Sequence, residues 1–232
     1  MNPALAAMWT ALPDCEPRRL VSDLFHALSQ PLTSLCCSLE LTLQQTPTQA
    51  QYRERVAGAL AQAERASWLS SAIRELLDAA ESGEPGEILQ LQAAVRDAVS
   101  DALPLAESAG MRLGYLPQSV CPVYFAAQRL RRALFHLLGF VVGWGRSGAL
   151  VEIKLSESGK DALLRLTVSG ESAVGEREPE SLTEEDRARL LSQRLGLGIA
   201  WNLFEAAGGT LCAGSEVNGI SLEVRLPLAM QR

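Results

Sequence analysis

The chain has 232 residues, 47% of them hydrophobic, which is enough for a sizeable buried core in one large domain or two modest ones. A formal net charge of −6 argues against a nucleic-acid-binding surface, which ordinarily carries a basic patch. No segment reaches the roughly 20 apolar residues of a membrane span, the N-terminus lacks a basic signal-peptide start, and the five cysteines form no Cys-x-x-Cys pair. We therefore expect a reduced cytoplasmic protein whose partners include neither nucleic acid nor a membrane.

The first predicted helix, over about 15–43, carries a lone histidine away from its apolar face. Apolar residues recur at three- and four-residue steps from Leu20 to Leu39, the spacing of one buried helical face. His26 lies two residues from members of this series on both sides, roughly 160–200° around the helix from them. Pro31, five residues later, should bend the helix. We expect His26 in solvent, either as an ordinary hydrated side chain or as a reactive group.

A second amphipathic helix follows after a short break. Thr46-Pro47-Thr48 interrupts the first helix, and Thr48 with Gln51 forms a capping-box pattern for a helix that extends to about Glu81. Its apolar positions predicted to share one face are Val56, Leu60, Ala63, Ala66, Leu69, Ile73 and Leu76 or Leu77. Two such helices cannot bury both apolar faces alone, so we expect a homodimer in which a second copy completes a four-helix bundle. Packing of the hairpin on the rest of the chain is the alternative.

The pattern changes after a Gly- and Pro-containing linker at 83–87, which separates a helical domain, 1–82, from a second domain, 88–232. We expect strands at about 88–91, 111–116, 120–124, 151–155, 163–168, 210–213 and 220–226, and helices at about 93–108, 126–143 and 198–207. The fold class is therefore α plus α/β. A helical hairpin that forms a dimeric four-helix bundle precedes an α/β sandwich around one mixed sheet.

The residues around His26 form a recognisable box, which reads His-Ala-Leu-Ser-Gln-Pro-Leu-Thr over 26–33. It resembles the phospho-acceptor box of sensor histidine kinases, usually His-Glu-Leu-Arg-Thr-Pro-Leu-Thr. The resemblance implies that His26 accepts a phosphoryl group, with Ser29 and Gln30 beside it in the catalytic site. The box departs from the family at Ala27, where the resemblance implies an acidic base, and at Gln30, where Thr or Asn is usual.

The second domain resembles the catalytic ATP-binding domain of the same family. The resemblance rests on the order of its elements, on the stretch 195–210, and on the final strand pair over 215–227. Gly196 and Gly198 match the glycine box whose backbone amides cradle phosphates at a helix N-terminus, and we expect a vestige of that phosphate loop here. Together with the histidine box, the resemblance covers nearly the whole chain and implies the histidine-kinase ATPase fold.

Three departures from the family predict that ATP chemistry has been lost. His136 and Phe140 stand at the two Asn positions of the family's Asn box, and a phenyl ring cannot ligate Mg²⁺. The adenine-reading Asp falls at Ser169 or Gly170, and neither supplies a carboxylate. An acidic stretch over 176–186 occupies the place of the ATP lid, where negative charge opposes a triphosphate.

These residues lead to a functional prediction. With the base, the Mg²⁺ ligand and the adenine contact missing, the acyl phosphate on a receiver domain is a better phosphoryl donor than ATP. We predict a two-component phosphorelay protein, a histidine phosphotransferase that carries a phosphoryl group on His26 to or from the receiver aspartate of a response regulator, with no cofactor and no metal. Two alternatives stay open: an active sensor histidine kinase that uses ATP and Mg²⁺ at a divergent site, and a catalytically silent dimeric module that binds receivers. Whether the chain is an enzyme stays open with them.

Overall fold

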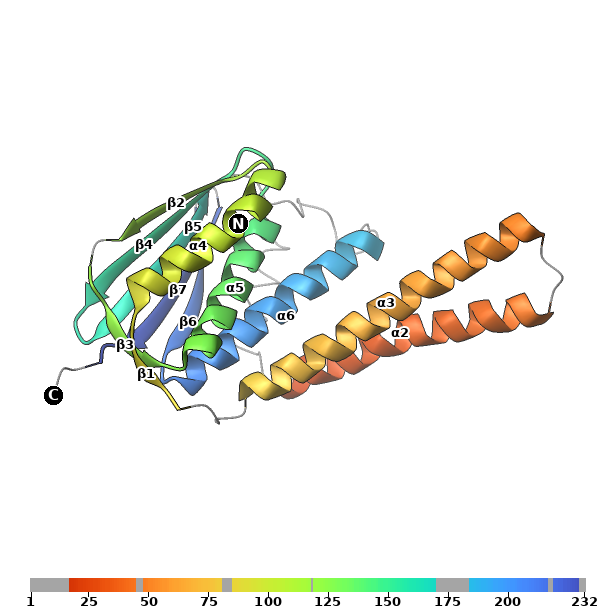
Figure 1. The fold of residues 1–232 in the computed structure, drawn as a ribbon, viewed down its shortest axis with the longest axis horizontal. Coiled ribbons are helices and arrows are strands. Elements are labelled where there is room, and N and C mark those ends of the chain that lie inside the picture. Colours follow the sequence, from red (N-terminus) through yellow and green to blue (C-terminus); the bar gives the residue numbers. More distant parts are fainter. Residues whose placement is uncertain are drawn as a thin grey trace. The chain divides into compact units, whose positions relative to one another are not determined.

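The computed structural model describes residues 17–44, 48–80, 85–117, 119–169, 184–216 and 219–229. They fall into two compact units, one within Asp14–Asp78 and the other within Ala79–Arg232. A helical part followed by an α/β part is the predicted fold class, and this order is confirmed (Figure 1). None of the helices in the described ranges is both long and apolar enough to cross a membrane. The predicted domain boundaries stay predictions, and the first two residues of the predicted linker, 83–87, lie outside the described residues.

The helical unit is a hairpin of α2 (Pro17–Gln44) and α3 (Gln49–Ala80), close to the predicted bounds. The predicted capping box is confirmed. The backbone N–H of Thr48 donates to Gln51 Oε1 at 3.0 Å, and the N–H of Gln51 donates to Thr48 Oγ1 at 3.4 Å. These two reciprocal bonds satisfy backbone donors that the first turn of a helix otherwise leaves free, so they fix the start of α3.

Only part of the apolar surface of each helix of the hairpin is buried. Among the side chains of α3 that the structure describes, five apolar ones are buried: Ala59, Ala66, Leu69, Ala72 and Ile73. Val56 and Leu60, which the sequence places on the apolar face of α3, are 44% and 58% exposed in the single chain, where the hairpin alone is expected to leave apolar surface uncovered. On α2, Pro31 is buried, whereas Leu32 and Leu39 are each 45% exposed. Part of the apolar face predicted for each helix is therefore exposed in the single chain.

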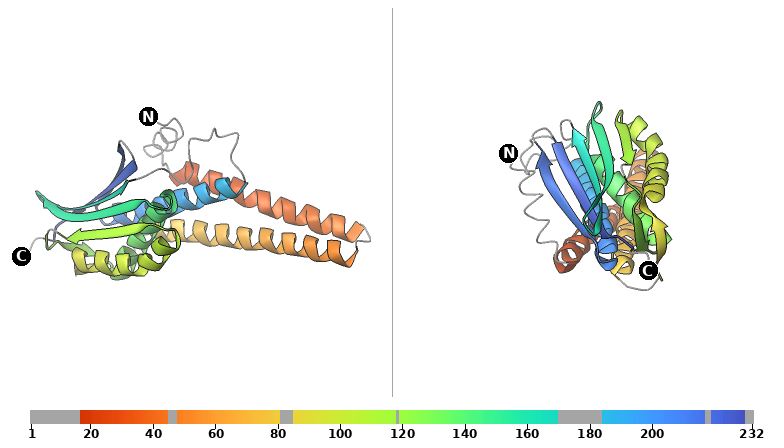
Figure 2. Two further views of the ribbon diagram at one scale, coloured as in Figure 1. Left: turned by 90° about the horizontal axis from the view of Figure 1, so that it is seen from above. Right: turned by 90° about the vertical axis from the view of Figure 1, so that its left-hand side faces the viewer.

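The α/β unit is built on a five-stranded mixed sheet. In chain order its elements are β1 (Glu87–Gln90), α4 (Leu91–Ser108), β2 (Arg112–Pro117), β3 (Pro122–Phe125), α5 (Ala127–Trp144), β4 (Leu150–Ser158), β5 (Asp161–Ser169), α6 (Glu184–Ala206), β6 (Thr210–Glu216) and β7 (Gly219–Pro227). The strand order is β2-β4-β5-β7-β6, with β2 and β4 parallel and the other pairs antiparallel. Strands β1 and β3 form a separate antiparallel pair. The three helices cover one face of the large sheet (Figure 2).

The core of this unit lies between the large sheet and the helices. Alternate residues of the three central strands point into it, as the period of two predicts. The buried strand residues are Val151, Ile153, Leu155, Ala162, Leu164, Leu166, Val168, Ile220, Leu222, Val224 and Leu226. Phe204 of α6 is fully buried and meets Phe125 of β3 edge to face, with ring centroids 6.2 Å apart. The predicted α/β sandwich is therefore a layer of helices packed on one face of a sheet.

The predicted start of the last helix is wrong. Helix α6 begins at Glu184, 14 residues before the expected start at Gly198, and it runs without a break through both Gly196 and Gly198. Most residues that precede Gly196 in this helix are strong helix formers, chiefly Glu, Arg, Ala, Leu and Gln. A single glycine costs a helix only about 1 kcal/mol relative to alanine. The glycines therefore mark positions inside a helix rather than its beginning.

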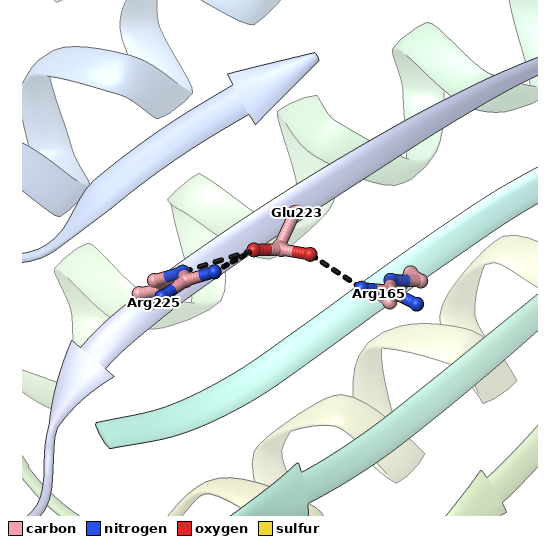
Figure 3. A network of polar contacts seen from close by, with 3 residues as sticks. All are labelled: Arg165, Glu223 and Arg225. Carbon is pink, nitrogen blue, oxygen red and sulfur yellow. Dashed lines mark hydrogen bonds and ion pairs between the residues drawn. The ribbon is translucent and has the colours of Figure 1, made fainter. Parts of the chain in front are cut away.

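A charged network lies on the face of the sheet opposite the helices (Figure 3). Glu223 of β7 accepts hydrogen bonds from Arg165 Nη2 at 2.7 Å and from Arg225 Nη2 at 2.6 Å. Arg165 and Glu223 are direct cross-strand partners, so their pairing also reports the register of β5 and β7. The hydrogen bonds from Arg165, and then those from Arg225, hold the pKa of Glu223 below its usual range.

The lowered pKa of Glu223 makes a prediction for stability against pH. A carboxylate with a lowered folded-state pKa contributes stability above its unfolded pKa and loses it as pH falls through the folded value. We expect Glu223→Gln to cost about 1 kcal/mol in the free energy of unfolding at pH 7, since both arginines are partly hydrated. The difference between the two proteins should begin to shrink as pH falls through about 4, near the unfolded pKa, and should vanish below the lowered folded-state pKa, which urea unfolding at several pH values would measure. Glu152→Gln, which removes the exposed pair with Lys154, is the matched control and should change little. A gap for Glu223→Gln that stays constant down to pH 3 would contradict the prediction.

Candidate functional site

The predicted phospho-acceptor lies on α2. The backbone of His26 belongs to this helix, and its side chain lies outside the described part of the structure. Two hydroxyls of the box bond to the helix backbone: Ser29 Oγ donates to the carbonyl of Phe25 at 2.9 Å, and Thr33 Oγ1 donates to the carbonyl of Ser29 at 2.8 Å. Pro31 cannot donate to the carbonyl four residues earlier, yet the helix continues through it.

The side chains next to His26 determine which chemical groups the box can offer. Ser29 and Gln30, both exposed, lie within about one turn of His26 along the helix, as the sequence predicts from their spacing. Ala27 is half-buried and presents only a methyl group, so the position after the histidine offers no carboxylate. The box therefore supplies an imidazole and neighbouring polar groups, without an acid or a base at the adjacent position.

The second predicted site lies where α5 meets α6. Phe140 of α5 is 2% exposed and belongs to the core, so it carries neither an oxygen nor access to solvent. His136 is half-buried, with its ring edge-on to Phe135 at a centroid distance of 5.6 Å. A Cβ on Gly196 of α6 would lie 3.5 Å from His136 Nδ1, so Gly196 allows the two helices to approach closely here. His136 thus faces α6.

The N-terminal half of α6 extends this contact along α5. Gln193 is 7% exposed and packs against Gly143, where an added Cβ would lie 2.9 Å from Gln193 Nε2. Among the described residues neither the Nε2 nor the Oε1 atom of Gln193 has a hydrogen-bond partner. His136 and Gly143 are seven residues apart, so they lie on one face of α5, and α6 covers that face.

Gln193 was not among the residues expected at a site. A signal for it exists, because Gln193 stands four, seven and eleven residues before Leu197, Ala200 and Phe204, all of them buried. A polar residue in register with such a series indicates a buried amide at a helix interface. The position was overlooked because the helix was expected to start after it.

The residues present at this interface do not fit a Mg²⁺-nucleotide. Inside an α-helix the N–H groups of Gly196 and Gly198 donate to carbonyls four residues earlier, so they are not available to phosphates, and the predicted vestigial loop is a helical segment instead. Ser169 ends β5 and offers only a hydroxyl, while Gly170 and residues 176–183 of the acidic stretch lie outside the described residues. Within the described ranges, no cluster of three His, Cys, Asp or Glu side chains could hold a metal ion.

Comparison with known proteins in sequence gives one clear relative. No family model matches the chain. It is 26% identical over 206 residues to the sensor protein IrlS of Burkholderia pseudomallei, an alignment that takes in 84% of this chain and 43% of IrlS. The chain therefore spans less than half the length of this relative.

Comparison of folds points the same way. Histidine kinase AdeS of Acinetobacter baumannii matches with a TM-score of 0.62 and 18% identity, over 88% of this chain and 98% of the AdeS chain. Histidine kinase ThkA, in a complex with response regulator protein TrrA, matches with a TM-score of 0.65 and 14% identity, over 91% of this chain and 61% of that chain. Matches of this extent include both the helical hairpin and the α/β unit. The chain thus resembles the sensor protein IrlS in sequence and has the fold of the histidine kinases AdeS and ThkA, a helical part followed by an α/β domain of the histidine-kinase ATPase type.

Proposed function

We propose that the chain is a histidine phosphotransfer protein of two-component signalling, which carries a phosphoryl group on His26 to or from the receiver aspartate of a response regulator. One observation carries the proposal. The phospho-acceptor box is retained on α2, whereas α6 packs over the α5 face that corresponds to the family's Asn box. The partner class has support from ThkA, whose structure was solved in complex with a response regulator.

The proposed reaction asks little of this chain. An aspartyl phosphate is an acyl phosphate, so its phosphorus is already activated. The unprotonated nitrogen of a neutral imidazole attacks the phosphorus, an N–P bond forms, and the P–O bond to the aspartate breaks to release a carboxylate. The receiver brings its own carboxylates and Mg²⁺. This chain then needs only the imidazole of His26 and a helix face on which the receiver docks, and the absence of an acid at Ala27 is no obstacle.

The same proposal includes a homodimer located in the cytoplasm. Support for the dimer comes from apolar side chains that the hairpin leaves exposed on both helices, among them Leu39 of α2 and Leu60 of α3. A second copy offers two helices of matching pattern, which would convert the hairpin into a four-helix bundle.

One observation favours a second candidate, a module that binds receiver domains without accepting a phosphoryl group. Ala27 replaces the acidic residue that the histidine-kinase resemblance implies beside the histidine. A chain that only sequesters receivers would not need that acid.

Phosphoryl transfer from a receiver tests the proposed function. With a receiver domain carrying ³²P on its aspartate, we expect acid-labile label on the wild-type chain and none on His26→Ala, because no other group on α2 replaces the imidazole. His136→Ala is the matched control, since it removes the other of the two histidines in the sequence, and it should be labelled like the wild type. Label that persists on His26→Ala would overturn the proposal. Stable receiver binding without label on the wild type would favour the silent module.

Nucleotide binding is tested separately. A ligand present at 100 times its dissociation constant stabilises the folded state by about 2.7 kcal/mol. We expect Mg²⁺-ATP to leave the thermal unfolding midpoint unchanged and [γ-³²P]ATP to leave no label on His26, because Phe140 is buried and the Gly196 and Gly198 amides are bonded within α6. A rise in the midpoint together with label on His26 would instead establish a kinase with a divergent site.

A further inference from the structure

A small cavity opens in the α/β unit where α5 begins and α6 ends, beside the strand pair β1 and β3 (Figure 1). Its volume is about 200 Å³, and all the residues that line it belong to this unit. An apolar cavity of roughly 150 Å³ can hold benzene, whereas drug-sized ligands take about 300 Å³ or more. The cavity therefore has the size for a molecule with a single ring.

The cavity exists because the residues around it are too small to fill it. Four of them carry at most a methyl group: Gly86, Ala126, Ala206 and Ala207. The ring of Phe125 is held elsewhere, because Phe125 is 3% exposed and packs edge to face on Phe204. Close packing normally leaves few voids larger than a water molecule, so an opening of this size can receive a ligand.

Tyr124 supplies an aromatic wall that is already in place. A Cβ on Gly86 would lie 2.6 Å from Tyr124 Cε1, so the ring lies directly against the backbone of Gly86. Ile88 is the partner of Tyr124 across β1 and β3, and such cross-strand neighbours support one another. Tyr124 is nevertheless 60% exposed. A second ring placed on it would remove apolar area from water.

Arg129 gives the cavity a positive charge. It is half-buried in the first turn of α5. A guanidinium has five N–H donors in a planar fork, so it can bind a carboxylate through two of them and keep its other contacts. None of the described residues that line the cavity is acidic. Glu205, next to Ala206 on α6, accepts a hydrogen bond from Trp201 Nε1 at 3.2 Å.

We propose that this cavity binds a small aromatic carboxylate, whose single ring lies on Tyr124 and whose carboxylate pairs with Arg129. Leu203 and Ala207 of α6 add an aliphatic surface for the rest of the ring. A neutral aromatic ligand would not use the guanidinium, and an aliphatic acid would not use the tyrosine ring. The inference goes beyond the proposed phosphoryl transfer and gives the α/β unit a ligand of its own.

The cavity is separate from the α5 face that corresponds to the family's Asn box. Arg129 precedes His136 by seven residues and Phe140 by eleven, which is roughly 10 and 16 Å along the helix axis. A ligand in the cavity therefore leaves the contact between His136 and Gly196 closed, and it requires neither a metal nor a phosphate-binding loop.

Amide NMR of the chain tests the site with sodium benzoate as the probe. The amides of Gly86 and Ala207 should shift saturably, with a dissociation constant of about 1 mM or lower. Gly148, whose N–H donates to the carbonyl of Gly110 beyond the C-terminal end of α4, should not shift. Benzamide keeps the ring without the charge and should bind about tenfold more weakly. Cyclohexanecarboxylate keeps the charge without the aromatic ring and should bind about threefold more weakly or worse.

Two pairs of matched variants locate the ligand. Ala206→Leu fills the cavity from an exposed position and should raise the dissociation constant at least about tenfold, whereas Ala127→Leu, at an exposed position that does not line the cavity, should bind like the wild type. Arg129→Gln should weaken benzoate about tenfold and leave benzamide unchanged. Arg131→Gln removes the same charge from an exposed pair with Asp101 and should change neither. Thermal unfolding of each variant would show that the fold persists.

The outcomes separate the site from the class of its ligand. No saturable shift with benzoate up to about 10 mM would overturn the site. Shifts that persist in Ala206→Leu would place the ligand elsewhere and overturn it as well. Equal binding of benzoate and benzamide, or equal losses in Arg129→Gln and Arg131→Gln, would overturn the carboxylate. None of these results depends on label at His26, so a failure of the site and a failure of the proposed function are distinguishable.

Discussion

The direct packing of α6 on α5 decides what the α/β unit can do. Gly143 of α5 leaves room for Gln193 of α6, and Gly196 of α6 leaves room for His136 of α5. This contact requires α6 to begin well before its glycines, which commits their backbone amides to the helix. The α5 face that His136 and Gly143 share is therefore an interior surface, which supports the proposal that phosphoryl chemistry takes place on the hairpin alone.

The hairpin can carry that chemistry because an acyl phosphate needs little help. ATP hydrolysis or autophosphorylation asks for a metal, donors to the phosphates and a base, all positioned together. Transfer from an aspartyl phosphate asks for one accessible nucleophile and a surface that holds the receiver in line with it. The alanine at position 27 and the burial of Phe140 remove groups that autophosphorylation from ATP needs. Transfer from an aspartyl phosphate needs neither group from this chain. The two departures from the family are therefore consistent with one another.

Patterns within short stretches of the sequence predicted most helices and strands. They did not predict the contacts between helices, which join residues far apart in the sequence. The box of Thr48 and Gln51 is a local hydrogen-bond pattern, and alternation along β4, β5 and β7 reports a sheet with one buried face, so both were found. The helix was expected to start at Gly198 because the two glycines resemble a break, whereas the cost of about 1 kcal/mol for Gly196 is offset by a contact with α5 that no local pattern contains. The three- and four-residue period places Val56 and Leu60 on the apolar side of α3 without saying which neighbour covers them, and both are exposed in the single chain.

The proposed dimer also bears on where the histidine stands. In that dimer α2 packs against α3 and against a second copy, and the exposed Leu32 and Leu39 lie on the side left for the second copy. Position 26 lies roughly 120–140° around the helix from these two leucines, so the proposed bundle leaves its side open to a receiver. A histidine shifted by one residue, to position 25, would lie within about 40° of both leucines and would be covered by the second copy. In the proposed bundle, the packing of the helices therefore restricts where a phospho-acceptor can stand on α2.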